Sequence, residues 1–193
     1  MVAAVGDTIV DLTPVLHVFG TRQPIDERAL AKAIEMGEER TFDQDPKYAI
    51  RLLVDIAIKA LSPAINDPTT AVQALDQIED LLLRLGRRRL EISEYRDKHG
   101  NLRLIAPCPT WEDFLRLAFD EIRYCGSHSV QVMRRMKALV KDLSLRLSED
   151  RSPALRHWEE RLQTTIARSF DDVEEKLEAS VEDRQGLGVP RWQ

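Results

Sequence analysis

The sequence predicts a mainly α-helical fold of the α+β class, with about six helices around a buried central helix. Two observations support this prediction. Apolar residues recur three and four positions apart through most of residues 26–86 and 110–184, as they do on one face of a helix. Two Asp-Pro pairs, beginning at Asp45 and Asp67, mark helix starts, because aspartate caps a first turn and proline is tolerated within it.

Residues 1–20 predict a small β element. Three short apolar segments, at residues 2–5, 8–12 and 15–19, are separated by the turn dipeptide Gly6-Asp7 and by Pro14. Because so small an element is marginal by itself, we expect it to pack on something larger.

Residues 26–86 predict the helical core. Asp26 caps a first helix, and the helix that follows Asp45 has apolar residues over most of its circumference. Its charged residues are spaced four apart and form one narrow stripe, which is typical of a central, nearly surrounded helix. We therefore expect four of its side chains to be inaccessible: Ile50, Leu53, Ile56 and Ala57.

The second half of the chain predicts a hairpin at residues 90–106 and three helices over residues 110–184. Thr110 and Asp113 form a capping-box pattern for the first of these helices. The last helix begins near Ser152, and its apolar stripe continues to Val181. We expect one globular domain over residues 1–184 and a flexible tail over residues 185–193.

Composition excludes several classes of protein. Of 193 residues, 43% are hydrophobic and 32% charged, which is typical of a globular protein, and the net charge of −5 gives no basic footprint for nucleic acid. Two cysteines, Cys108 and Cys125, suit a reducing cytoplasm better than a disulfide framework. No segment has the roughly 20 apolar residues that span a membrane. We expect a soluble, cytoplasmic chain.

Polar residues are densest between residues 40 and 70, and this block is the candidate ligand-binding site. A 15-residue helix is about 22 Å long, so the loops at its two ends cannot share one small pocket unless a loop folds back. Arg51 and Asp55 lie four residues apart and are expected to pair, and a buried pair would make Asp55→Ala cost about 3–5 kcal/mol. The candidate ligand-binding residues are Arg40, Gln44, Arg51, Asp55, Asn66, Asp67, Thr69 and Thr70.

Two interpretations of this block remain open. In the first, the residues are helix caps and ion pairs that hold the loops, and Asp67→Ala lowers stability modestly. In the second, the N–H groups of Thr69 and Thr70 at a helix start bind an anion, and the chain is a small-ligand-binding domain or an enzyme.

Metal and catalytic patterns are weak. Cys108, Cys125 and His128 fall short of the four ligands of structural zinc, and the oxygen donors near Asp45 and Asp67 have no EF-hand spacing. We predict no metal and no cofactor, and assign no catalytic residue. The basic cluster of Arg84 and residues 87–89 complements a helix dipole, or alternatively contacts anionic lipid head groups.

Three strings make the chain resemble a known family: Arg40-Thr41-x-x-Gln44-Asp45-Pro46, residues 53–57, and residues 60–71, which include Asn66-Asp67-Pro68-Thr69-Thr70. They resemble a bacterial family of predicted membrane proteins catalogued as domain of unknown function 2254. The likeness extends over roughly residues 1–147. It implies a soluble C-terminal domain that follows a membrane region, on the cytoplasmic face of the cell membrane, and it implies no reaction.

The leading hypothesis is therefore a cytosolic regulatory or assembly module of a membrane protein, which is not an enzyme. We expect it to form homo-oligomers, because the long amphipathic C-terminal helix can complete its burial against a partner. The rival hypothesis is the small-ligand or anion-binding domain that uses the polar block at residues 40–70.

Overall fold

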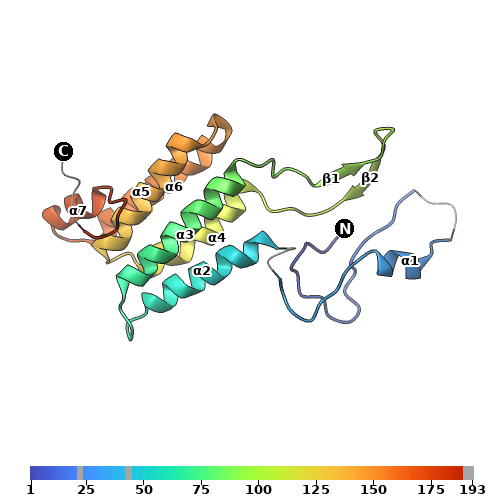
Figure 1. Cartoon of the computed structure of the whole chain (residues 1–193), viewed down its shortest axis with the longest axis horizontal. Coiled ribbons are helices and arrows are strands. Elements are labelled where there is room, and N and C mark those ends of the chain that lie inside the picture. The colour runs from blue at the N-terminus through green and yellow to red at the C-terminus, as the bar shows by residue number, and fades with distance from the viewer. Residues whose placement is uncertain (21–23, 42–44, 189–193) are drawn as a thin grey trace. The chain divides into compact units, whose positions relative to one another are not determined.

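The computed structural model of the chain describes residues 1–20, 24–41 and 45–188 (Figure 1). It is mainly helical, as predicted, and divides into two compact units. Unit 1 comprises residues 1–48 and 91–108, and unit 2 comprises residues 49–90 and 109–193.

Unit 2 is a bundle of helices that lie side by side in Figure 1. Its order is α2 (Pro46–Ala60, whose first turn belongs to unit 1), α3 (Pro68–Gly86), α4 (Trp111–Cys125), α5 (Val130–Arg146), the 3₁₀ helix η1 (Glu149–Arg151), α6 (Ser152–Ser169) and α7 (Val173–Ser180). Local signals start several of these helices. Thr110 and Asp113 form the predicted capping box of α4, and Ser129 caps α5.

The central helix of the bundle is α5. It packs against α3, α4, α6 and α7, and its fully buried side chains include Met133, Met136 and Leu139. Aromatic residues of α4 and α6 complete the core, and the rings of Phe119 and Trp158 meet edge to face with centroids 5.2 Å apart.

The prediction that the helix after Asp45 is central was wrong. In α2, Ile50 and Ala57 are fully buried as expected, but Leu53 is only half-buried and Ile56 is 49% exposed. The helix therefore turns one face to the core and leaves Ile56 exposed beside the charged residues Asp55 and Lys59. The narrow charged stripe misled the prediction, because the exposed surface of α2 includes apolar residues beside that stripe.

Unit 1 contains α1 (Glu27–Lys32) and a two-stranded antiparallel sheet of β1 (Glu94–Arg96) and β2 (Leu102–Ile105). The sheet confirms the predicted hairpin, and Tyr95 pairs with Leu104 across it. Asp97 shapes the turn, because its carboxylate accepts hydrogen bonds from the N–H groups of His99 and Asn101. Asp26 caps α1 as expected.

The small β element predicted for residues 1–20 does not form strands. Val2 and Ala3 both donate their N–H groups to the carbonyl of Val15, so the segment folds back on itself without a regular ladder. The predicted turn at Gly6-Asp7 is present, since the N–H of Asp7 reaches the carbonyl of Ala4. The alternation of apolar residues was not sufficient to predict strands here. Because two N–H groups bond to the same carbonyl, residues do not pair one to one, and no strand ladder forms.

The final helix is divided. The predicted single helix from residue 152 to about residue 184 stops at Ser169, and α7 begins at Val173 after a break. Asp172 caps α7 by accepting hydrogen bonds from the N–H groups of Glu174 and Glu175. The domain boundary expected at residue 184 stays a prediction, but the backbone of residues 185–188 is held by hydrogen bonds, and residues 189–193 lie outside the described residues.

Candidate functional site

Arg51 forms the first cluster of the predicted polar block. Its Nε donates to Asp55 Oδ1 at 2.8 Å, as the four-residue spacing predicts, and its Nη2 donates to Glu121 Oε2 of α4 at 3.1 Å. The guanidinium thus joins α2 to α4. These hydrogen bonds raise the pKa of Arg51, and the hydrogen bond that Glu121 accepts contributes most. In turn, the Arg51 guanidinium lowers the pKa of Glu121.

The pair lies at the surface, so the large cost expected of Asp55→Ala for a buried pair does not apply. The Arg51 side chain is 27% exposed and the Asp55 side chain is 50% exposed. We expect Asp55→Ala to lower the free energy of unfolding by less than about 1 kcal/mol, as for other exposed pairs, because Arg51 keeps Glu121 as a partner. Urea denaturation measures this change, and a loss above about 3 kcal/mol would place the pair in the interior.

Residues 66–70 form the second cluster, which is the turn into α3. Asn66 has a φ of 48°, and its N–H donates to the carbonyl of Ser62 at 2.8 Å. Asp67 is the N-cap: its Oδ1 accepts from the N–H of Thr70 at 3.1 Å and its Oδ2 from the hydroxyl of Thr70 at 2.5 Å. A carboxylate of the chain itself therefore occupies the helix start that an anion would need. Thr69 Oγ1 lies 3.5 Å from Gln131 Nε2 of α5.

The cap at Asp67 makes a pH-dependent contribution to stability. The side-chain and backbone hydrogen bonds from Thr70 lower the pKa of Asp67. A lowered carboxyl pKa stabilises the folded state above the unfolded pKa, about 4 for aspartate, and this contribution is lost as the pH falls through the lowered value. We expect the stability difference between wild type and Asp67→Asn to be constant near neutral pH and to shrink below about pH 4. Thermal unfolding from pH 7 to pH 2 measures this, and a difference that grows on acidification would contradict it.

The candidate residues do not form one site. Arg51 lies in the second turn of α2 and Asn66 lies beyond its end, so about 14 Å of helix separates the two clusters. Arg40 belongs to unit 1, where it borders a hollow of about 820 Å³ together with Asp7 and Asp45. Gln44 lies outside the described residues. The use of these residues in ligand binding stays a prediction.

Asp45 joins the N-terminal loop to the start of α2. Its Oδ1 accepts from the N–H of Lys47 at 3.0 Å, as a cap does, and the side chain is nearly inaccessible. Gly6 lies against Oδ2 with a φ of 87°, and a Cβ there would come within 2.2 Å of that oxygen. The carboxylate is therefore covered by backbone, which favours a structural role for the hollow's one buried acid.

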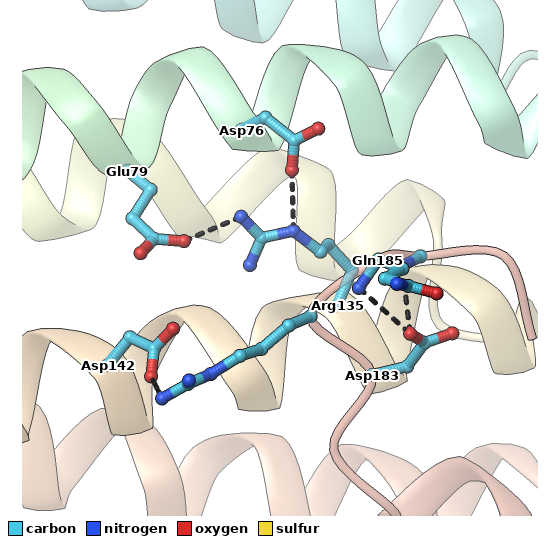
Figure 2. A network of polar contacts seen from close by, with 8 residues as sticks. Asp76, Glu79, Arg135, Asp142, Asp183 and Gln185 are labelled. Atoms are coloured by element: carbon cyan, nitrogen blue, oxygen red, sulfur yellow. Dashed lines mark hydrogen bonds and ion pairs between the residues drawn. The ribbon is translucent and has the colours of Figure 1, made fainter. Parts of the chain in front are cut away.

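A polar cluster that the sequence did not predict surrounds the buried Arg135 (Figure 2). Arg135 of α5 is only 4% exposed, and its Nε donates to Asp76 Oδ1 at 2.7 Å and its Nη2 to Glu79 Oε2 at 2.5 Å. Burial opposes the charge of Arg135, but the hydrogen bonds that Glu79 and Asp76 accept from it outweigh this effect and raise the pKa of the guanidinium. The cluster ties α3 to α5.

The same face of α5 holds the C-terminal segment. Asp142 is buried and pairs with Arg184. Asp183 accepts hydrogen bonds from three backbone N–H groups, those of Gln185, Gly186 and Gly188, at 2.7–3.0 Å. The N–H of Asp183 donates to the carbonyl of Arg134 at 3.4 Å, and Figure 2 draws Asp183 and Gln185 together with Arg135. The sequence gives no spacing signal for the pairs of Arg135 with Glu79 and of Asp142 with Arg184, because the partners are more than 40 residues apart.

The basic cluster of Arg84 and residues 87–89, at the C-terminal end of α3, lies beside Arg151. Arg84 pairs with Asp80 one turn earlier, and Arg151 of η1 donates to the carbonyls of Gly86 and Arg88. Arg151 therefore satisfies carbonyl groups at the C-terminal end of α3.

His128 contacts the carbonyl of Ser169 through Nδ1. In the described part of the chain, no three His, Cys, Asp or Glu side chains gather as a metal site requires.

Comparison with known proteins places the chain in a family. The family model described as "Predicted membrane protein (DUF2254)" matches residues 1–142, and the chain belongs to this family. Uncharacterized proteins of Mycobacterium bovis and Mycobacterium tuberculosis are 36% identical over 107 residues, which are 55% of this chain and 20% of each relative. The match thus spans about a fifth of the length of these relatives. No solved structure is significantly similar to the chain.

Within residues 1–20, 24–41 and 45–188, every helix is too short or too polar to cross a membrane. The family model ends at Asp142, whereas α6 and α7, which cover one side of α5, lie beyond it.

Proposed function

We propose that this chain is a cytoplasmic regulatory or assembly module of a membrane protein, that it associates with copies of itself and that it is not an enzyme. Membership in a family of predicted membrane proteins supports the first part, together with relatives about five times longer than the matched segment. The two free thiols, Cys108 and Cys125, fit a reducing compartment.

The observation that carries the proposal is the poor burial within unit 1. Among its described residues only Ala3 and Asp45 are buried, and the side chains of both strands are exposed. Leu12 and Phe19 are among the exposed apolar residues of the N-terminal segment, and Tyr95 and Ile105 among those of the hairpin. Exposed apolar surface on this scale is typical of a segment that another surface covers, as an assembly module requires.

The polar block supports a structural role over the ligand-binding rival. Arg51 is paired with two carboxylates, and Asp67 already accepts the N–H of Thr70 at the helix start proposed for an anion. A thermal-shift screen with phosphates, nucleotides, carboxylates and divalent cations separates the two hypotheses. We expect that no ligand stabilises the wild type while failing to stabilise Asp67→Ala. A real site would instead show a rise in melting temperature that saturates with ligand concentration, by mass action, and that the variant loses.

Membrane attachment and orientation test the proposal directly. The experiment tags the C-terminus of the chromosomally encoded protein and separates cell fractions. We expect the protein in the membrane fraction, with the tag digested by protease in inside-out vesicles and protected in right-side-out vesicles. Recovery in the soluble fraction, or digestion in right-side-out vesicles, would overturn the proposal.

A further inference from the structure

The apolar stripe of the C-terminal region continues through the break between α6 and α7. Its residues are Leu155, Trp158, Leu162, Ile166, Phe170, Val173, Leu177 and Val181, spaced three or four apart. On one uninterrupted helix these side chains share a single face. In the structure, the first half of the stripe is buried, but Val173 is 70% exposed and Leu177 is 65% exposed.

The break itself has no obligatory cause in the sequence. It consists of Phe170, Asp171 and Asp172, with neither glycine nor proline, so every residue in it can adopt helical torsion angles. Phe170 and Asp172 are extended, with ψ values of 133° and 142°. The bend is held by the cap that Asp172 provides for α7, which a continuous helix would not need.

Beyond the break, α7 and residues 181–188 are fixed to α5 by a defined set of contacts. Lys141 Nζ lies 2.6 Å from a carboxylate oxygen of Glu182, Arg184 pairs with buried Asp142, and Arg134 donates to the carbonyl of Glu178. Gly186 lies against Val72 of α3, where a Cβ would come within 2.2 Å of a methyl group. Ala179 is fully buried. The surface that receives this segment is specific in shape and charge.

We propose that two copies of this chain exchange α7 and the segment that follows it, each straightening into one continuous α6–α7 helix. This inference rests on the self-association in the proposed function and names its interface. Every contact of α7 with α5 then forms between chains instead of within one, so the exchange retains those contacts. The straightened helix also places Val173, Leu177 and Val181 in line with the face that α6 buries.

Substitutions at the break shift the exchange in opposite directions. Val173 is the first residue of α7, where proline is well tolerated, and Asp172 already has the extended backbone that precedes a proline. Val173→Pro therefore keeps the bent monomer but prevents a continuous helix. Asp172→Ala removes the cap that holds the bend in the monomer, and because two bends straighten for each dimer formed, we expect the dissociation constant of the dimer to fall by about thirtyfold.

Light scattering coupled to size-exclusion chromatography measures both effects over a range of concentrations. We expect a concentration-dependent dimer for wild type, a monomer for Val173→Pro, and a more stable dimer for Asp172→Ala. Val173→Ala is the matched control, since it removes the same side chain but leaves the helix free to straighten, and we expect it to retain a weaker dimer. A wild type that stays monomeric, or a folded Val173→Pro protein that dimerises like wild type, would overturn the exchange.

Crosslinking identifies the exchanged segment even where a variant fails to fold. Isotope-labelled and unlabelled wild-type chains are mixed in equal amounts, unfolded and refolded together. A carbodiimide then joins Lys141 to Glu182, whose charged groups are in contact. We expect about half of the crosslinked peptides from the dimer fraction to carry one labelled and one unlabelled partner, and none from the monomer fraction. A dimer with only same-label crosslinks associates elsewhere, which overturns the exchange and leaves the proposed function standing.

Discussion

Replacing Asp76 and Glu79 together with alanine is expected to lower the free energy of unfolding by about 3–5 kcal/mol. Arg135 is 4% exposed, and these two carboxylates are the acidic groups with which it forms ion pairs in the described structure. Without them, the fold retains a buried guanidinium with no opposite charge, and its desolvation is no longer offset. Urea denaturation followed by circular dichroism measures the loss.

Two further variants identify the cause of that loss. Adding Arg135→Met to the double variant removes the unpaired charge and fills similar volume, so we expect most of the stability to return. Asp80→Ala on the same helix removes a pair in which both side chains are more than half exposed, and we expect it to change stability by less than about 1 kcal/mol. If the triple variant is as unstable as the double variant, the contacts of Arg135 matter more than its charge.

These ion pairs also explain why the sequence does not identify the central helix. On α5, Arg134, Arg135, Lys141 and Asp142 resemble the polar face of a surface helix. Arg135 and Asp142 are nevertheless buried, because α3 and the C-terminal segment supply opposite charges. Periodicity shows which residues share a face, but it carries no information on a partner 40 or more residues away.

Features that depend on neighbouring residues were predictable. The caps at Asp67 and Thr110 and the hairpin around Asp97 form as expected, since each is determined within a few residues. The break before α7 was not predictable from the pattern, because the apolar stripe continues through it, whereas the cap at Asp172 and the packing of Ala179 and the following segment against α5 favour the bend. The exposed hairpin strands show the same limit, because their apolar pattern predicts the strands but not their exposure.

The candidate site was predictable to a similar degree. The spacing of Arg51 and Asp55 correctly indicated a pair within α2. It did not indicate Glu121, which comes from α4 and places the pair at a junction between helices. The cap at Asp67 followed from the Asp-Pro dipeptide, whereas the contact of Thr69 with Gln131 depends on how α3 and α5 pack.

The two candidate central helices are distinguished by matched truncations of one large aliphatic side chain. Leu139 of α5 is fully buried, so Leu139→Ala leaves a cavity among side chains that relax only partly, and we expect it to cost about 2–5 kcal/mol. Ile56 of α2 is 49% exposed, so Ile56→Ala removes a side chain already half in water, and we expect a loss below about 1 kcal/mol. Urea denaturation of both variants gives the comparison. Equal losses would mean that a partner covers Ile56 of α2 in solution. Because such binding depends on concentration, the protein concentration at which the two losses become equal would then report the affinity of that partner.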